Sequence, residues 1–324
     1  MVTPSNEHAD AQPALIGIDW GSSSLRAWLI GPDGAVLDER STKEGASTLV
    51  KHEDFAAALD GVAGAWRAQY PDLPLLACGM VGSSHGWLDV PYARSPAGSL
   101  ELAAGLARAP DDGPHIVPGL MFDEPGLPPD LMRGEETQIA GALHAQPALA
   151  AASCIVLPGT HSKWARVADG QVTRFATWMT GELYAVLRKA SVLGRLMPED
   201  AADDPDAFLE GVDAVRAHGE LGLSHQIFAA RTLGVTERMP AAALSEYLSG
   251  LLIGHELRAA LAWRDEAGLA AKPLALVGEP RLCARYQEAL RRFGHPAGHV
   301  LDNVAPGGLL ALAQASGLLP AATP

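Results

Sequence analysis

Residues 15–30 read LIGIDWGSSSLRAWLI, two apolar runs joined by a turn of small residues. This composition predicts strands over Leu15–Asp19 and Leu25–Ile30, with Gly21–Ser24 as the turn between them. A Pro-Asp-Gly turn follows, so Ala35–Arg40 is expected to return as a third strand. The sequence therefore predicts an antiparallel meander at the start of the ordered chain.

The same pattern recurs near the middle of the chain. Cys154–Leu157, Lys163–Val167 and Gln171–Met179 read as strands, separated by turns at Pro158–Ser162 and Ala168–Gly170. The repetition predicts an α/β protein with two similarly built domains that face each other across a cleft, where ligand sites tend to lie.

Several other elements can be placed from periodicity and composition. A helix is expected where four apolar residues recur at helical spacing, Phe55, Leu59, Val62 and Trp66. Leu75–Val81 is predicted to be a buried parallel strand, and residues 109–130, rich in Pro, Asp and Gly, a surface loop. The last third of the chain is expected to be largely helical, with one strand at Leu274–Val277.

These elements suggest a division of the chain. We expect a disordered leader over residues 1–14, an N-terminal domain over 15–140 and a C-terminal domain over 141–324. Pro306 is well placed to begin a last helix, which can pack back across the cleft.

Composition restricts the partners of the protein. The 324 residues are 48% hydrophobic, enough for sizeable cores, and their formal net charge is −14. That charge argues against a nucleic acid or an anionic membrane as partner. Because only five lysines are present, an anionic substrate would have to be bound by a few well-placed donors.

The sequence also indicates a compartment. Three cysteines are present, none of them in a C-x-x-C spacing, which is typical of buried, reduced thiols. The first residues lack the features of a signal peptide, and no apolar run approaches the roughly 18 residues that a membrane span needs. We therefore expect a cytoplasmic protein; the oligomeric state stays open, and an oligomer is compatible with the sequence.

The first turn has the chemistry of an anion site. Gly21, Ser22 and Ser23 can offer backbone N–H groups and hydroxyls to a phosphate, and Arg26 can reach back as a fork. Asp19, just before the turn, can hold a hydrated Mg²⁺. The turn alone could equally be an ordinary hairpin with a solvated arginine.

The second turn has similar chemistry. A glycine, two hydroxyls and two basic side chains lie together there, in Gly159, Thr160, His161, Ser162 and Lys163. Two such turns, each within one copy of the repeat, favour the hypothesis that they clamp a polyphosphate and its metal ion. Neither a G-x-G-x-x-G string nor a Walker A loop occurs in the chain.

A pair of carboxylates lies between the two turns. Glu135 and Glu136 follow Gly134 where a helix is expected to begin, and either could act as general base toward a hydroxyl nucleophile. Acidic residues are also favoured in a first helical turn by the helix dipole, so a structural role is the alternative.

The motifs resemble a known superfamily. Asp19–Arg26, DWGSSSLR, is similar to the first phosphate motif of the sugar-kinase branch of the actin-like (ribonuclease H-like) ATPases. Gly159–Ser162 is similar to its second phosphate hairpin, and Gly278–Pro280 to its adenosine motif. The resemblance implies two actin-like domains with mixed β-sheets flanked by helices, and Gly278 and Glu279 at the nucleotide.

Within that branch the chain resembles the 2-dehydro-3-deoxygalactonokinase family more closely. The shared strings are the DWGS start, Gly79–Ser83, Met132–Gln138, Pro158–Trp164 and Met179–Glu182. This resemblance implies that ATP, with Mg²⁺, phosphorylates 2-dehydro-3-deoxy-D-galactonate on its 6-hydroxyl, as part of galactonate catabolism. The small-molecule sugar acid and ATP would then be the partners of the protein.

The resemblance also implies roles for particular residues. The wider branch takes its catalytic base from a Gly-Asp string; Gly134-Glu135 stands in its place here, one methylene longer, and we favour Glu135 over Glu136. The loop after the Leu75–Val81 strand contacts the sugar in that branch. That loop holds Ser84, His85 and Trp87, although a core position is equally open for Trp87.

Arg94, Arg133 and Lys163 are candidates to bind the substrate carboxylate, and the sequence does not choose among them. It does not choose the sugar epimer either.

Two alternatives compete with a kinase. Gly82–Gly86 matches the G-x-S-x-G nucleophile elbow of serine hydrolases, but the residues after Ser84 read as extended chain rather than as the required helix. A non-catalytic, actin-like sugar sensor is the second alternative. Such regulators usually carry an added DNA-binding segment, for which residues 1–14 are too short.

Overall fold

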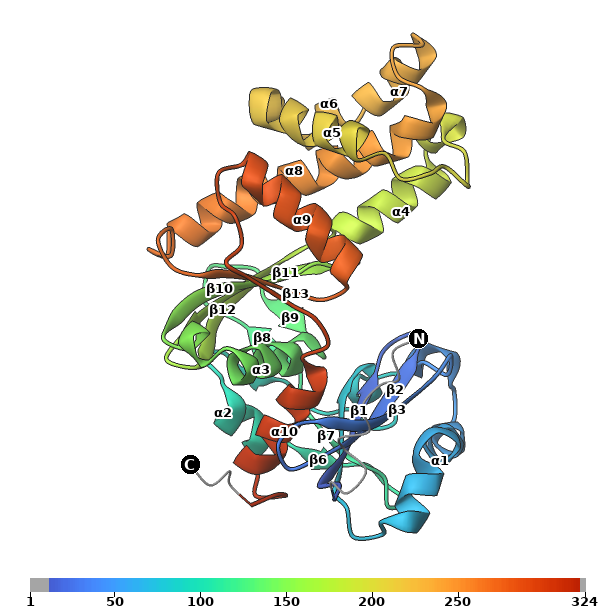
Figure 1. Ribbon diagram of the computed structural model, residues 1–324, viewed down its shortest axis with the longest axis vertical. Coiled ribbons are helices and arrows are strands. Elements are labelled where there is room, and N and C mark those ends of the chain that lie inside the picture. The colour runs from blue at the N-terminus through green and yellow to red at the C-terminus, as the bar shows by residue number, and fades with distance from the viewer. Residues whose placement is uncertain (1–11, 321–324) are drawn as a thin grey trace, which may run out of the picture. The chain divides into compact units, whose positions relative to one another are not determined.

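The computed structural model describes residues 12–320, which form two compact units (Figure 1). Unit 1 comprises residues 12–151, 167–174 and 303–320, and unit 2 comprises residues 152–166 and 175–302. The expected leader, residues 1–14, lies outside the described residues except for its last three.

Unit 1 is built on a six-stranded mixed sheet. Its strands are β1 (Leu15–Trp20), β2 (Leu25–Ile30), β3 (Val36–Thr42), β4 (Leu75–Gly79), β6 (Ala107–Arg108) and β7 (His115–Ile116). They lie in the order β3-β2-β1-β4-β7-β6, in which β1, β2 and β3 are antiparallel neighbours while β4 pairs in parallel with β1 and with β7. The predicted meander and the parallel strand are confirmed.

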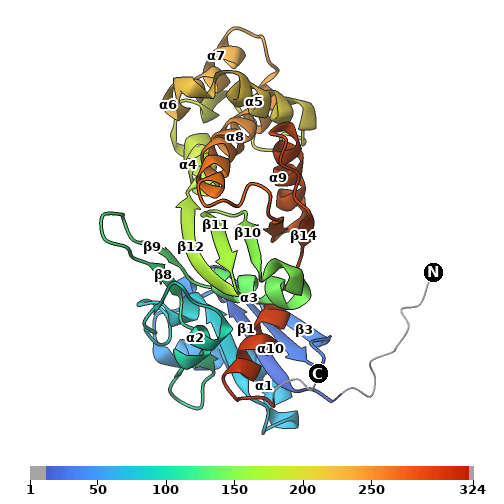
Figure 2. The same cartoon turned by 90° about the vertical axis from the view of Figure 1, so that its left-hand side faces the viewer.

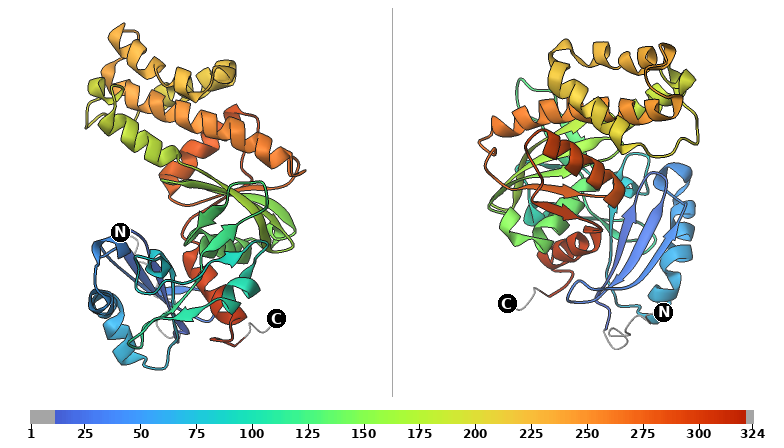
Figure 3. Two further views of the ribbon diagram at one scale, coloured as in Figure 1. Left: turned by 180° about the vertical axis from the view of Figure 1, so that it is seen from behind. Right: turned by 45° about the horizontal axis from the view of Figure 1, so that its top comes forward.

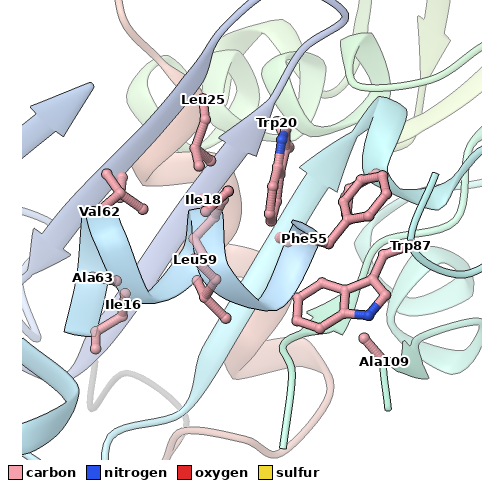
Figure 4. Close-up of a cluster of buried hydrophobic side chains, with 14 of the residues drawn as sticks. Ile16, Ile18, Trp20, Leu25, Phe55, Leu59, Val62, Ala63, Trp87 and Ala109 are labelled. Atoms are coloured by element: carbon pink, nitrogen blue, oxygen red, sulfur yellow. The ribbon is translucent and has the colours of Figure 1, made fainter. Parts of the chain in front are cut away.

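Helices cover both faces of this sheet. They are α1 (His52–Gln69), α2 (Ser99–Ala104), α3 (Glu135–Ala145) and α10 (Ala305–Ala315), with 3₁₀ turns at Ala46–Thr48, Met80–Gly82 and Pro147–Leu149. α1 buries the predicted apolar stripe against the sheet, where Trp20, Phe55 and Trp87 pack ring against ring (Figure 4). On the other face α10 packs on β1 and against α3 (Figure 2).

Close backbone approach explains why glycines occur where α3 meets α10. A Cβ on Gly141 would lie 1.9 Å from the carbonyl oxygen of Val304, and one on Gly308 would lie 2.0 Å from that of Thr137. Only residues without a side chain allow this packing, which joins the C-terminal helix to unit 1.

The region from residue 109 to 130 is only partly the predicted surface loop. It contributes β7 to the six-stranded sheet and β8 (Leu120–Phe122) to a small sheet with β5 (Ala93–Arg94) and β9 (Asp130–Met132). The prediction was wrong here because turn residues dominate the composition, whereas the short apolar pairs between them are buried in the core.

Unit 2 repeats the sheet pattern. β10 (Ala152–Leu157), β11 (Ser162–Ala168), β12 (Gln171–Trp178), β13 (Leu274–Val277) and β14 (His299–Leu301) lie in the order β12-β11-β10-β13-β14. β10, β13 and β14 run parallel to one another. The order β12-β11-β10-β13 copies β3-β2-β1-β4 of unit 1, so the predicted duplication is confirmed. The far ends of β11 and β12 group with unit 1.

The rest of unit 2 is helical, as predicted. Its helices are α4 (Thr180–Ala190), α5 (Pro205–His218), α6 (Leu223–Gln226), α7 (Ala229–Val235), α8 (Leu244–Asp265) and α9 (Pro280–Arg292), with 3₁₀ turns at Gly194–Leu196, Gly219–Leu221 and Ala241–Ala243. The long, mostly buried α8 packs against α5, α4 and α9, and α9 packs on β13 (Figure 3). None of these helices, nor any other within residues 12–320, combines the length and apolarity of a membrane span.

The division of the chain differs from the boundary expected after residue 140. That position lies inside α3, and the units separate after Ala151. α3 belongs to unit 1, where it packs on α10.

Candidate active site

Asp19 and Arg26 form the centre of the first turn. They are directly opposite each other on β1 and β2, and Arg26 Nη2 donates to Asp19 Oδ2 over 2.8 Å. Burial raises the pKa of Asp19, while the guanidinium beside it acts in the opposite direction. The two residues predicted to share a phosphate and its metal therefore hold each other in the described structure, with Arg26 still nearly half-exposed.

The turn itself is exposed and supported from behind. Ser22 and Ser23 are exposed, while the backbone N–H groups of Ala46 and Ser47 donate to the carbonyls of Gly21 and Ser22. A Cβ on Gly45 would lie 2.3 Å from the Ser22 carbonyl oxygen, so this support requires glycine. The carbonyls are thus tied inward, and the serine hydroxyls face solvent, as an anion site requires.

Three chain segments converge beside Asp19. A Cβ built on Gly79, at the end of β4, would lie 3.4 Å from Asp19 Oδ1, and one on Gly134 would lie 3.3 Å from the Gly79 Cα. Gly134 has φ 107°, a left-handed conformation that favours glycine, and α3 begins directly after it. The geometry brings the predicted carboxylate pair to the same end of the sheet as Asp19.

Glu135 and Glu136 have different environments. Glu136 is 1% exposed; its Oε2 accepts from the Gly134 N–H and its Oε1 from the Thr137 hydroxyl. Burial, with a contribution from the charge of Glu135, raises the pKa of Glu136 to about 8. Glu135 is half-buried, and its Oε2 accepts from the Arg133 N–H at 2.9 Å. Glu135 is therefore the more accessible carboxylate of the pair.

Two of the three predicted sugar-binding residues in the loop after β4 are exposed, and the third is buried. Ser84 and His85 are exposed, with Ser84 Oγ 3.1 Å from His85 Nδ1. Trp87 is 1% exposed and stacks on Phe55, so it belongs to the core and cannot stack on a sugar in this conformation. Turns, not a helix, follow Ser84, so the nucleophile elbow does not form.

The candidate cations for a substrate carboxylate differ in their partners. Arg94 is exposed and paired with Asp123 over 2.8 Å, and Lys163 is buried with its Nζ donating to Thr177 Oγ1 over 2.8 Å. Arg133 stacks on Tyr92 and donates one Nη2 bond to the Val90 carbonyl. Its buried Nε and Nη1 have no hydrogen-bond partner within residues 12–320, so Arg133 has donors left for an anion.

The second turn connects β10 to β11 in unit 2. Thr160 and His161 are exposed, and His161 Nε2 is paired with the carboxylate of Glu182 on α4. Ser162 is fully buried and its hydroxyl bonds Tyr286, so it does not face a ligand as expected. Lys163 points to the opposite side of β11 from Ser162 because side chains alternate along a strand.

A pocket of about 520 Å³ adjoins this turn within unit 2. Gly159 and Thr160 line one side of it, together with Thr180 and Gly181 at the beginning of α4. The rest of the lining comes from the turn after β10, from α4, from α8 and from the beginning of α9: Pro158, Tyr184, Ser249, Leu252, Ile253, Glu279, Leu282, Arg285 and Tyr286. Its size and its mixed apolar and polar lining are typical of a small-molecule site.

Of the predicted adenosine motif, Gly278–Pro280, only Glu279 lines the pocket. Glu279 lines it, but the Glu279 carboxylate also caps α9 by accepting from the N–H groups of Arg281 and Leu282, which lowers its pKa. Gly278, with φ 143°, allows the sharp change of direction from β13 to α9. Its place is beside the pocket rather than in the lining.

Several residues of the pocket and its surroundings carry no site motif in the sequence. Thr180 and Gly181 occur only within the Met179–Glu182 string, and Tyr286 lies at ordinary helical spacing from Leu282 and Leu290. Glu256, which lies behind the pocket, gave no signal, because a single glutamate in a long helix is usually solvent-exposed. Only the packing of four separate elements brings these residues together.

The donor set near Asp19 fits a magnesium ion carried by phosphates. No group of three or more His, Cys, Asp or Glu side chains in the described part of the chain could hold a metal by itself. Asp19 offers a single carboxylate near the end of β1. Its Oδ1 lies beside Gly79, 3.4 Å from the position that a Cβ on Gly79 would occupy. Mg²⁺ usually binds through one or two carboxylates together with water and substrate phosphates, so the residues present fit such an ion.

Fold and site together define a class. Two units with the same strand order, an acidic, small-residue turn in unit 1 and a pocket of about 520 Å³ beside the matching turn in unit 2 agree with the actin-like ATPase fold. A family model described as 2-keto-3-deoxy-galactonokinase matches residues 19–312. The chain belongs to this family.

Individual relatives agree with that assignment. The chain is 37% identical over 303 residues to a Rhizobium meliloti (strain 1021) protein named probable 2-dehydro-3-deoxygalactonokinase DgoK1, covering 92% of this chain and 96% of that protein. It is also 37% identical over 279 residues to the Escherichia coli (strain K12) 2-dehydro-3-deoxygalactonokinase, covering 86% and 90%. A crystal structure of a 2-dehydro-3-deoxygalactonokinase family protein from Sinorhizobium meliloti superposes with a TM-score of 0.83 at 36% identity, covering 93% and 98%.

Proposed function

We propose that this protein is an ATP-dependent kinase that phosphorylates 2-dehydro-3-deoxy-D-galactonate on its 6-hydroxyl. The observation that carries the proposal is the half-buried but accessible carboxylate of Glu135, which follows the left-handed Gly134 near the end of the strand that holds Asp19. The substrate is taken from the names of the relatives, which match this chain over nearly its whole length. Neither a serine hydrolase nor a sugar sensor is favoured by these relatives.

In this proposal Glu135 accepts the proton of the sugar hydroxyl. Phosphoryl transfer depends mainly on positioning and charge neutralisation, and the base needs only to receive the proton as the hydroxyl attacks. Glu136, buried with a raised pKa, is neutral at pH 7 and adds no second negative charge beside the attacking oxygen. Glu135 is thus the proposed base, and Glu136 is a neutral carboxyl group that stabilises the beginning of α3 through its hydrogen bonds.

The nucleotide is proposed to bind in the pocket of unit 2. A Cβ on Gly159 would meet nothing within 4 Å, so the backbone there is open to a phosphate, and Thr160 is exposed beside it. The first turn of unit 1, with Ser22, Ser23 and Arg26, would bind the transferred phosphoryl group. Asp19 would hold Mg²⁺, which neutralises phosphate charge when bound.

The sugar acid is proposed to bind at the loop after β4. Ser84 and His85 are exposed to bind its hydroxyls, and Arg133 retains unpaired N–H groups for its carboxylate. Arg94 and Lys163 already have partners, so Arg133 is the preferred cation for the carboxylate.

The compartment proposed for this enzyme is the cytoplasm, because its three cysteines, Cys78, Cys154 and Cys283, are buried free thiols.

A coupled assay of ADP formation tests the function. Purified protein is given Mg²⁺, ATP and one acceptor from a panel of 2-keto-3-deoxy sugar acids, the corresponding aldonic acids and simple hexoses. We expect turnover with the 2-keto-3-deoxy acids and the highest kcat/KM for the galactonate-derived compound. Turnover with hexoses and none with the acids, or covalent labelling of Ser84 by a fluorophosphonate, would show that the proposal is wrong.

The base is tested by the Glu135→Gln variant. Removal of a general base lowers kcat by about 10²–10⁴-fold, whereas the affinity for an ATP analogue should stay near that of the wild type because Glu135 is not in the nucleotide pocket. An unchanged turnover number would exclude this role for Glu135.

A further inference from the structure

A chain of buried hydrogen bonds lies behind the second turn. Glu256 on α8 is 2% exposed and accepts from three side chains: Trp164 Nε1 to Oε1 over 2.8 Å, Tyr286 Oη to Oε2 over 2.6 Å, and the Thr180 hydroxyl to Oε2. The donors come from β11, α9 and α4. One carboxylate thus connects four elements of unit 2.

The direction of these bonds can be deduced from their chemistry. Tyr286 has one hydroxyl proton and donates it to Glu256, so the Ser162 hydroxyl, 2.9 Å from Tyr286 Oη, must donate to Tyr286. The Ser162 oxygen is then free to accept from the Gly159 N–H at 3.4 Å. A directed series of donors therefore runs from the backbone of the second turn to the Glu256 carboxylate.

The Glu256 carboxylate also fixes the beginning of α4, which lines the pocket beside the second turn. Thr180, which donates to Glu256, is the first residue of α4, and the next residue, Gly181, would place a Cβ 2.6 Å from the Gly159 carbonyl oxygen. The Glu182 N–H donates to the Thr160 carbonyl over 3.0 Å. The turn and the beginning of α4 are therefore fixed against each other, and both are fixed to Glu256.

We propose that Glu256 is a positioning residue for nucleotide binding. Through Tyr286 and Ser162 it fixes the Gly159–Ser162 turn, and through Thr180 it fixes the beginning of α4, so that both walls of the pocket are held in one arrangement before the phosphates arrive. This inference rests on the proposed function, because it assumes that the pocket binds ATP. Buried polar networks of this kind specify one conformation when every member has a partner.

Tyr286→Phe is the sharpest test. It removes the hydroxyl that connects Ser162 to Glu256 but keeps the ring that lines the pocket. The matched control is Tyr247→Phe, because Tyr247 is also a buried tyrosine of unit 2 and lies outside the pocket lining. Ser162→Ala and the Ser162→Ala/Tyr286→Phe double variant complete a cycle.

Binding of a non-hydrolysable ATP analogue is measured by calorimetry, and KM for ATP and for the sugar acid by the coupled assay. We expect the Kd of the analogue and the KM for ATP to rise about five- to tenfold in Tyr286→Phe, the effect of one lost buried hydrogen bond. The KM for the sugar acid should change less than about twofold, and the double variant should bind no more weakly than the worse single variant, because both changes break one hydrogen-bonded series.

The outcomes separate this inference from the proposed function. If the wild-type protein binds the analogue and turns over the sugar acid while Tyr286→Phe binds like Tyr247→Phe, the positioning role is wrong and the kinase remains. Equal increases in both KM values would also overturn it, since they indicate a general loss of structure. A wild-type protein that binds no nucleotide overturns both.

Discussion

At the scale of single residues, environment separates side chains that look equivalent in the sequence. Glu135 and Glu136 are neighbours, yet Glu135 is only half-buried and Glu136 is 1% exposed. Ser162 and Lys163 belong to the same predicted phosphate turn, yet the first bonds Tyr286 and the second Thr177. The sequence motif brings both members of each pair together, and burial decides which of their atoms are open to solvent.

Glu136→Gln should change how stability depends on pH. The pKa of Glu136 is about 8 in the folded protein and near 4.5 when unfolded, so the unfolded chain releases its proton first as pH rises. Between these values the wild type loses up to about 1.4 kcal/mol per pH unit from this group. Glutamine stays neutral; its oxygen can accept from the Gly134 N–H, and its Nε2 can donate to the Thr137 hydroxyl oxygen, which reverses that bond. Urea unfolding should therefore show the variant gaining stability relative to wild type from pH 5 to 8.

Glu101→Gln is the control, because the pKa of Glu101 is shifted in the opposite direction to that of Glu136. Backbone hydrogen bonding to the Gly98 N–H lowers the pKa of Glu101, so its contribution is present above its unfolded pKa and is lost as pH falls. The Glu101→Gln variant should be slightly less stable than wild type at pH 7 and approach it in acid. A Glu136→Gln curve parallel to that of the wild type throughout would contradict the raised pKa.

Arg133→Met should weaken binding of the sugar acid. The methionine keeps an apolar stem beside Tyr92 but removes the charge, and hydrogen bonds to charged groups contribute about 1.5–3 kcal/mol. That loss corresponds to a rise in KM for the sugar acid of about 10- to 100-fold, with KM for ATP unchanged. If Arg94→Met raises this KM and Arg133→Met does not, the carboxylate is bound by Arg94 instead.

At the scale of elements, close approach decides which segments form the site. Gly45 lets residues 45–47 contact the first turn, and Gly181 lets the beginning of α4 contact the second turn. α3, which carries Glu135, is held by its packing on α10 through Gly141 and Gly308. The helix that carries the proposed base therefore depends on a helix about 170 residues later in the chain.

Gly141→Ala should destabilise the protein. The added methyl would lie 1.9 Å from the Val304 carbonyl oxygen, which cannot move without displacing α10. We expect the free energy of unfolding to fall by about 1–3 kcal/mol, the usual cost of overpacking. Gly61→Ala is the matched control: a Cβ there meets nothing within 4 Å on α1, so the variant should be about 0.5–1 kcal/mol more stable. Equal stabilities for the two variants in urea unfolding would argue against tight packing of α3 on α10.

At the scale of the whole molecule, anionic ligands meet a protein of net charge −14. In the proposed function, binding therefore depends on local donors, and the two units provide different ones: hydroxyls, Arg26 and Arg133 in unit 1, and backbone N–H groups and Thr160 in unit 2. Each unit is accordingly expected to respond to a different substrate.

Hydrogen exchange can measure this separation. A non-hydrolysable ATP analogue alone should slow exchange in residues 158–163 and 180–184, because a ligand stabilises the part of the fold that binds it. The sugar acid alone should slow exchange in residues 79–94 and 133–136. Protection of residues 79–94 by the analogue alone, with none at 158–163, would contradict the assignment of the nucleotide to unit 2.

Much of the fold could be read from local patterns. Strand alternation, turn residues and helical spacing depend on nearby residues, so both meanders, α1, β4, β13 and the beginning of α10 at Pro306 were predicted within a few residues. The short strands between residues 109 and 130 were not, because two or three apolar residues form a strand only when a neighbouring strand is present. The expected cleft between the domains stays a prediction.

By itself, the sequence determined the duplicated α/β architecture, the two small-residue turns and the carboxylate pair at a helix start, since each is written in contiguous residues. Only the tertiary structure decided that Glu136 and Trp87 are buried, that Arg133 keeps unpaired donors, and that Glu256 connects four elements behind the pocket. The physical reason is that burial and hydrogen-bond partnership are set by segments distant in the chain, and a carboxylate changes its role with the neighbours that packing gives it.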